Sequence, residues 1–82
     1  FHFSDVISIR DTELIINFGK RVKQLRTEQN LSQQLLANKA EIELSQIFRI
    51  EKGKTNVTLS TIGAIANALD ISIASLFDFS SI

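Results

Sequence analysis

The sequence predicts an all-α fold in which five short helices form one compact domain. After residue 11 the apolar residues recur three or four positions apart, which is the period of helices with one buried face. Ser, Thr or Asp residues suited to capping precede four of these five stretches, and the chain has no proline. Helices this short are not stable alone, so burial between them must hold the fold together.

The first two helices are separated by a short break near Asn30. Asp11 or Thr12 is a suitable N-cap for the first helix, and Asn30 is a suitable stop. Ser32 then caps a short second helix. The residues expected to face inward from these two helices are Ile15, Phe18, Val22, Leu25, Leu35, Leu36 and Ala40.

Three further helices are expected in the second half of the chain. The third has Ile47 and Ile50 inward and ends at Gly53, where a left-handed conformation costs least. Thr58 or Ser60 begins the fourth helix, and Ser72 caps a short fifth helix. The apolar residues expected to bury these last two helices are Leu59, Ile62, Ala66, Leu69, Ile73, Leu76 and Phe77.

Residues 1–10 form an extension ahead of the helical domain of residues 11–82. Their sequence, FHFSDVISIR, is β-prone but only partly alternating, so a short strand or dimer arm is one interpretation. Such a strand would need a partner, for example the same segment of a second subunit. The longest apolar stretch, residues 62–79, is interrupted by Asn67, Asp70 and several serines. We therefore expect no membrane span and a cytoplasmic location.

The net charge of zero hides an uneven distribution along the chain. Residues 20–56 carry eight Lys and Arg against four Glu, a local charge of +4, while the remaining residues carry −4. A neutral total argues mildly against a nucleic-acid partner, but the basic middle of the chain is where such a surface would lie.

The second and third helices are separated by about three residues, which forces a steep crossing and gives a helix-turn-helix arrangement. The residues around it resemble the phage-repressor-like, xenobiotic-response-element type of helix-turn-helix DNA-binding family. The matching elements are LSQ at 31–33, RIEKGK at 49–54 and IANALDIS at 65–72, within a resemblance that spans about residues 18–77. The resemblance implies a lambda-repressor-like domain and a homodimeric regulator with its recognition helix at about 43–51.

The candidate DNA contacts lie on and beside this third helix. Arg49 is a candidate for a bidentate contact to guanine or for a phosphate contact, and Ser45 and Gln46 for base edges. Gln33, in the first turn of the second helix, is expected to bind a phosphate, with a solvated surface residue as the alternative. Phosphate contacts, or simply favourable charges at a helix C-terminus, are also expected from Lys52, Lys54, Thr55 and Asn56.

Leu44 and Phe48 depart from the polar residues that similar proteins usually carry on this face. They would read thymine methyl groups, extend the core, or contact a protein partner. Arg26 and Glu51 occupy positions that form a partly buried ion pair in similar proteins, and a solvated pair is the alternative. Glu41 stands where glycine is usual, so we expect either a strained positive φ or a different turn.

The C-terminal apolar residues exceed what one short helix can bury. We expect a dimer contact from them, with closure of the monomer core as the alternative; they are Ile73, Phe77, Phe79 and Ile82.

The leading functional interpretation is a sequence-specific DNA-binding transcriptional regulator, acting as a homodimer on a pseudo-palindromic operator. The alternative is a protein-interaction module on the same fold that does not read DNA. Catalysis is not expected, because His2 is the sole histidine and the chain has neither Cys nor Tyr. No cofactor, metal or small-molecule ligand is evident from the sequence.

Overall fold

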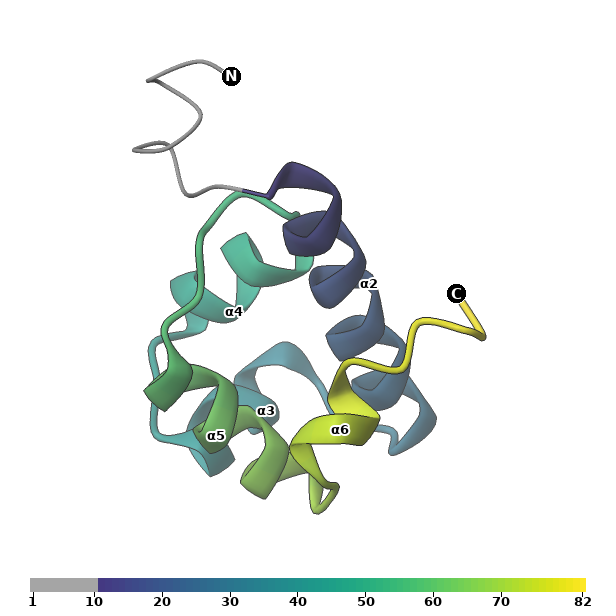
Figure 1. Ribbon diagram of the computed structural model, residues 1–82. Helices are drawn as coiled ribbons and strands as arrows, with labels where there is room; N and C mark the ends of the chain where they lie inside the picture. The colour runs from purple at the N-terminus through teal and green to yellow at the C-terminus, as the bar shows by residue number, and fades with distance from the viewer. Residues whose placement is uncertain (1–10) are drawn as a thin grey trace, which may run out of the picture.

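The computed structural model describes residues 11–82, which form an all-α fold, as the periodicity predicts (Figure 1). The suggested strand or dimer arm at residues 1–10 lies outside the described residues. The described part contains five helices, namely α2 (Thr12–Glu28), α3 (Gln33–Ala40), α4 (Leu44–Glu51), α5 (Leu59–Leu69) and α6 (Ile73–Leu76). Helix α2 packs against α4, and α3 packs against both α4 and α5.

Four of the five helices begin at the side-chain caps that the sequence indicates. The side-chain oxygens of Asp11, Ser32 and Ser72 each accept a hydrogen bond of 3.0 Å from a backbone N–H in the first turn of their helix. Thr58, rather than Ser60, caps α5 and accepts from Thr61 at 3.2 Å. These bonds satisfy N–H groups that a helix leaves unpaired at its start.

Helices α2 to α5 all end on one residue in the left-handed conformation. These residues are Asn30, Glu41, Gly53 and Asp70, with φ between 56° and 70°. In each case the residue that follows donates its backbone N–H to the carbonyl oxygen of the residue five positions before it, at 3.0 or 3.1 Å. This is the Schellman arrangement, and it confirms the predicted left-handed role of Gly53. It also resolves the alternatives for Glu41, which takes the positive φ.

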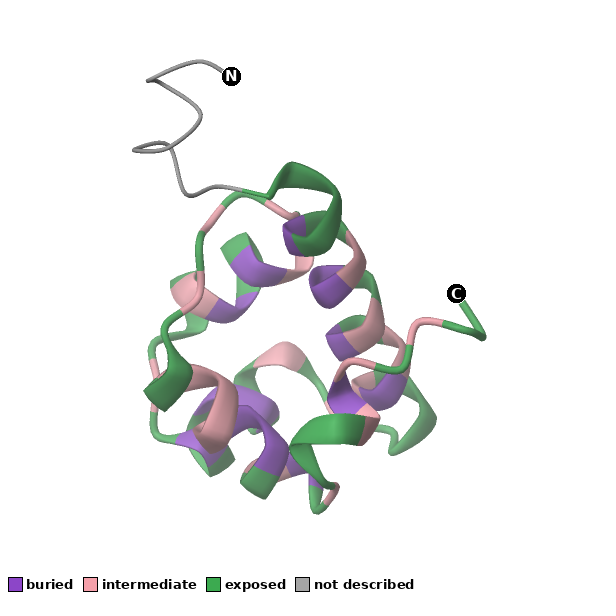
Figure 2. Cartoon of the chain, in the orientation of Figure 1, coloured by how far each residue is buried: buried purple, intermediate pink, exposed green. Residues whose placement is uncertain are grey.

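The buried residues lie on the sides of the helices that face the interior (Figure 2). Val22, Leu36, Ile47 and Leu69 are completely enclosed, which confirms the predicted inward positions at these residues. Gly19 allows α2 and α4 to approach closely, because a Cβ at this position would overlap the carbonyl oxygen of Ile50. Helices α2 and α4 are thus in contact backbone against backbone at this point.

Three predicted core residues, Leu35, Leu59 and Ile73, face solvent instead, and Ile73 is 53% exposed because the short helix α6 buries only Leu76. Leu35 is 49% exposed. Helix α3 has only eight residues and buries one narrow stripe, which contains Leu36, Ala37 and Ala40 but not Leu35. Leu59 is 86% exposed although it continues the stripe that includes Ile62. Leu59 is the first residue of α5, and the inward placement was wrong because the side of α5 that packs against the core begins at Ile62.

Candidate nucleic-acid interface

The turn between α3 and α4 sets the direction of the candidate recognition helix. It consists of Glu41, Ile42 and Glu43, as the expected three-residue separation requires. Glu41 reverses the chain in the left-handed conformation, and Ile42 then packs against the core. Because the turn is short and anchored by an apolar side chain, α4 leaves α3 in one fixed direction.

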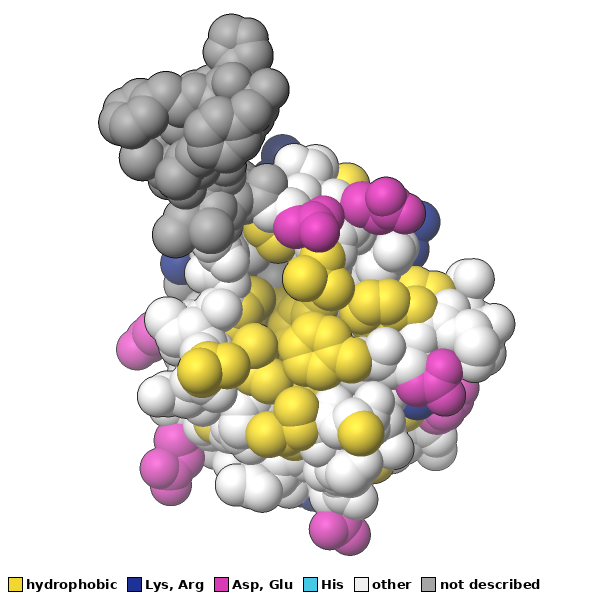
Figure 3. Space-filling model, in the orientation of Figure 1, with side chains coloured by type: hydrophobic (Ala, Val, Ile, Leu, Met, Phe, Trp, Pro, Cys, Tyr) yellow, Lys and Arg dark blue, Asp and Glu magenta, His cyan; other side chains and the backbone are white. Residues whose placement is uncertain are grey.

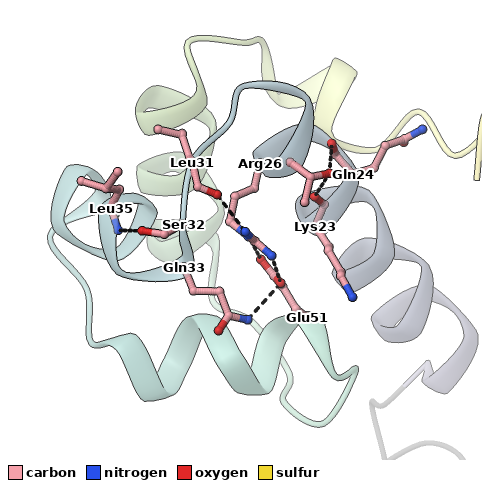
Figure 4. Close-up of polar contacts among 9 residues, drawn as sticks. Lys23, Gln24, Arg26, Leu31, Ser32, Gln33, Leu35 and Glu51 are labelled. Carbon is pink, nitrogen blue, oxygen red and sulfur yellow. Dashed lines mark hydrogen bonds and ion pairs between the residues drawn. The ribbon is translucent and has the colours of Figure 1, made fainter.

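An ion pair joins α2 to the end of α4 (Figure 4). Arg26 donates through Nε to Glu51 Oε2 at 2.7 Å and through Nη2 to Oε1 at 3.0 Å. The two side chains are 11% and 4% exposed, which confirms the partly buried pair and excludes the solvated alternative. The hydrogen bond to Glu51 raises the pKa of Arg26, so the pair favours the charged form of the guanidinium.

The same pair also organises the start of α3. The remaining Nη1 of Arg26 donates to the carbonyl oxygen of Leu31 at 2.8 Å, immediately before the N-cap Ser32. Gln33 donates from Nε2 to Glu51 Oε1 at 3.1 Å, so its side chain points toward the pair (Figure 4). The phosphate contact predicted for Gln33 therefore remains a prediction, and it would use the second N–H of the amide, because a phosphate oxygen only accepts hydrogen bonds.

The outward side of α4 carries four exposed side chains, Leu44, Ser45, Phe48 and Arg49, which we call the recognition face. Ile47 and Ile50, on the opposite side, are fully buried. Gln46 lies between the two sides, half-buried, with its amide nitrogen 3.5 Å from the Thr61 hydroxyl. The face therefore has the composition that helical spacing predicts, and Gln46 belongs to its margin.

Leu44 and Phe48 are 41% and 50% exposed, and neither belongs to the core cluster. Their exposure does not support the interpretation that they extend the core. Phe48 instead has the ammonium group of Lys52 over its ring, 5.4 Å from the centroid. A cation at this distance attracts the ring face and favours one orientation of the aromatic side chain.

Positive charge gathers where α4 ends. Arg49, Lys52 and Lys54 are all exposed, and among the described residues the side chains of Arg49 and Lys54 make no hydrogen bond or ion pair. Asn56 is also exposed, whereas Thr55 is half-buried. The turn after α4 thus presents cations beside the recognition face, which is the arrangement expected of phosphate contacts.

A separate apolar area covers the face seen in Figure 3, between α2, the loop after α4, α5 and α6. A pocket of about 120 Å³ opens between the same elements and is lined by Leu14, Ile15, Phe18, Asn56, Val57, Ile62 and Phe77. Acidic and basic side chains lie at the margins of this area rather than within it (Figure 3).

The predicted dimer residues divide into two groups. The Phe77 ring lies 5.2 Å from that of Phe18 and 6.1 Å from that of Phe79, so both C-terminal phenylalanines pack within the chain. Ile73 and Ile82 are exposed. Sequence reasoning missed Leu14, which is also exposed and lines the pocket together with Ile15 and Phe18 of the same helix. Its place in the pocket depends on α5 and α6, so no sequence signal marked it.

A family model described as helix-turn-helix, HTH_3, matches residues 22–76. The chain belongs to this helix-turn-helix family. Its relatives include the immunity repressor protein of Bacillus phage phi105, which is 40% identical over 58 residues; the match covers 71% of this chain but only 40% of that repressor. The HTH_3 assignment confirms the resemblance inferred from the LSQ and RIEKGK segments.

Two further relatives are control proteins of similar length. Control protein C.BamHI from Bacillus amyloliquefaciens is 38% identical over 66 residues, which cover 79% of this chain and 82% of that protein. The crystal structure of the restriction-modification controller protein C.AhdI from Aeromonas hydrophila has a TM-score of 0.74 and 39% identity, covering 76% of this chain and 94% of that one. The HTH_3 chain described here is thus a transcriptional regulator of the helix-turn-helix type. Within residues 11–82, no helix is both long and apolar enough to cross a membrane.

Proposed function

We propose that this chain is a sequence-specific DNA-binding regulator that acts as a homodimer, with α4 in the major groove of a pseudo-palindromic operator. The observation that carries the proposal is the recognition face, whose four side chains are exposed on a helix held by the nearly buried pair of Arg26 and Glu51. A helix presented in this way fits the major groove of DNA. Because its orientation is already fixed in the free protein, less conformational freedom is lost on binding.

The charges beside α4 support a DNA partner rather than a neutral one. Arg49 lies on the recognition face, and Lys52 and Lys54 follow in the next turn, where phosphates flank the groove. We assign Arg49 to a guanine edge, with Ser45 and Gln46 at neighbouring bases, and assign the lysines, Thr55 and Asn56 to the backbone. Gln33 would donate to a phosphate from its side-chain NH2 group, one N–H of which already bonds Glu51.

The apolar area between α2, α5 and α6 supports a second copy of the chain as its partner. It contains exposed aliphatic side chains and a pocket, and charges are confined to its margin (Figure 3). Water-exposed apolar area of this kind is stabilised by burial against a matching surface. We assign Ile73 and Ile82 to direct contact across the dimer, with Phe77 and Phe79 supporting them from within the chain.

The DNA assignment can be tested by selecting bound sequences from random DNA and then titrating salt. We expect a defined half-site, and an affinity that falls with a slope of about −0.9 per neutralised phosphate in a plot of log affinity against log salt concentration. Arg49→Ala should weaken the free energy of DNA binding by about 1–3 kcal/mol and reduce the base preference at one operator position. Lys54→Ala should instead weaken binding to all DNA sequences similarly and reduce the salt slope by about one. An affinity independent of salt would contradict the proposal.

The exposed apolar pair on the recognition face leaves one alternative, a module that binds a protein through Leu44 and Phe48. Phe48→Ala separates the two functions. Loss of a protein partner with unchanged DNA affinity and specificity would favour the alternative.

The relatives are regulators, which supports a function by binding rather than by catalysis. A DNA partner places the proposed function in the cytoplasm.

A further inference from the structure

The recognition face has an apolar half that ordinary hydrogen-bond readout does not use. Leu44 and Phe48 are four residues apart on α4, so their side chains are neighbours along one side of the helix. Both are exposed and neither packs against the core, so their apolar surface is free to meet whatever faces α4. Ser45 and Arg49 form the polar half of the same face.

Phe48 is also oriented before any partner arrives. The ammonium group of Lys52 lies 5.4 Å from its ring centroid and covers one face of the ring. This leaves the other face and the ring edge for contact, while the positive charge of Lys52 stays close to where a phosphate would lie. An oriented side chain loses less conformational freedom on binding, so the contact it makes is more favourable.

The chemistry of the major groove offers one apolar group to such a pair. Each base pair presents hydrogen-bond donors and acceptors there, and thymine adds a methyl group at C5. A donor or acceptor covered by Leu or Phe would lose water without gaining a partner, which is unfavourable. A C5-methyl group gains from the same contact, and 5-methylcytosine presents the equivalent methyl at the same carbon.

We propose that Leu44 and Phe48 read C5-methyl groups of pyrimidines in each operator half-site, beside the bases contacted by Arg49. This rests on the proposed function, because it requires α4 in the major groove. The recognition face then combines two kinds of readout: hydrogen bonds from Arg49 and Ser45, and a pair of methyl contacts from Leu44 and Phe48. Thymine and 5-methylcytosine are the two sources of the methyl group.

The test removes single methyl groups from the DNA while leaving every hydrogen-bonding edge intact. Each thymine of a selected half-site is replaced by uracil in turn, and affinity is measured at one salt concentration. At the positions under Leu44 and Phe48 we expect each replacement to weaken binding about fourfold, which corresponds to ~0.8 kcal/mol for one buried methyl-sized group. At other positions uracil should have little effect.

A second set of duplexes distinguishes the two sources of the methyl group. At a sensitive position, the A·T pair is replaced by G·C, with the cytosine either unmodified or methylated at C5. Recovery of about fourfold on methylation shows that the methyl group itself is read, whichever base carries it. No recovery, together with sensitivity to uracil, restricts the readout to thymine and still supports a methyl contact.

Matched variants connect the methyl groups to the two side chains. Phe48→Ala should abolish the uracil effect at one position and Leu44→Ala at another, and far-UV circular dichroism checks that each variant folds. Leu35→Ala is the control, because Leu35 is a leucine of similar exposure on α3, and its side chain points away from α4 and the ion pair (Figure 4). It should preserve both the affinity and the uracil effect.

The outcomes separate this inference from the function on which it rests. Specific, salt-dependent operator binding that is indifferent to uracil at every position would overturn the methyl readout and leave the DNA-binding proposal standing. Absence of any preferred DNA sequence would overturn both. Uracil sensitivity that persists unchanged in both alanine variants would also overturn the assignment to Leu44 and Phe48.

Discussion

At the scale of single residues, the structure depends most on Arg26 and Glu51. Their paired side chains join three elements, because Arg26 also binds the carbonyl oxygen before α3 and Glu51 also accepts from Gln33. Desolvation opposes the attraction between the charges, so the pair need not stabilise the fold relative to an apolar pair. Its role is positional, since the groups it joins fix α4 relative to α2 and to the start of α3.

Removing one member of this pair should therefore be costly. We expect Glu51→Ala to lower the free energy of unfolding by about 3 kcal/mol, because the Arg26 guanidinium would remain nearly buried without a counter-charge. Urea denaturation measures this difference. Glu28→Ala is the matched control; Glu28 is exposed on α2, and its loss should change stability by no more than about 0.5 kcal/mol.

An equal effect of the two substitutions would show that the pair contributes nothing specific. The double variant Arg26→Met with Glu51→Ala adds a second check. We expect the double variant to lower the free energy of unfolding by less than Glu51→Ala alone does, because it leaves no unpaired charge.

At the scale of helices, the chain repeats one C-terminal motif four times with different residues. The left-handed positions are Asn30, Glu41, Gly53 and Asp70. Asn and Asp tolerate this conformation, and Gly adopts it without steric cost, but the Cβ of a glutamate makes it unfavourable by about 1–2 kcal/mol. After α2, α3 and α5 an apolar residue follows and packs against the core. After α4 the following residue is Lys54, exposed beside the recognition face.

Glu41 is consequently a site where glycine should stabilise the domain. We expect Glu41→Gly to raise the free energy of unfolding by about 0.5–1 kcal/mol. The strain energy that glycine removes from the folded state is larger than the free energy lost because glycine makes the unfolded chain more flexible. Thermal unfolding measures the change. The control is Glu13→Gly, where the helical backbone of α2 needs no positive φ and a loss of about 1 kcal/mol is expected. Destabilisation by Glu41→Gly would contradict this account of the turn.

At the scale of the whole molecule, we propose that one surface binds DNA and a second surface forms the dimer. The recognition face and its flanking cations lie on and after α4, whereas the apolar area lies between α2, α5 and α6 (Figures 1 and 3). Two copies joined through the apolar area would present two recognition helices to one duplex. On a palindromic site these helices must be about 34 Å apart, which is one turn of DNA.

The proposed dimer predicts that Ile73→Glu shifts the protein toward monomer. Ile73 is 53% exposed, so the substitution should not affect the core, but a charge buried at an interface is strongly unfavourable. We expect the dimer dissociation constant to rise at least about tenfold, corresponding to 1.4 kcal/mol or more, in sedimentation equilibrium. Leu35→Glu is the control at similar exposure on α3. Equal dissociation in both variants, or none in either, would argue against Ile73 as a dimer contact.

The sequence alone determined the helices and their caps, because these depend on residues close together in the chain. Apolar spacing predicted the buried stripes of α2 and α4, and Asp11, Ser32 and Ser72 marked where helices begin. The family resemblance supplied the pairing of Arg26 with Glu51, which are 25 positions apart. Leu44 and Phe48 could be placed on an outward face by spacing, but spacing did not distinguish solvent from a core edge.

Tertiary structure decided where the core stops and which residues share a surface. Leu35 and Leu59 have the spacing or composition of core residues, yet the neighbouring helices do not reach them. Likewise, the pocket brings Leu14, Val57 and Phe77 together from three distant segments. Local pattern sets which side of a helix is apolar, but burial depends on what packs against that side, and this is a property of the assembled fold.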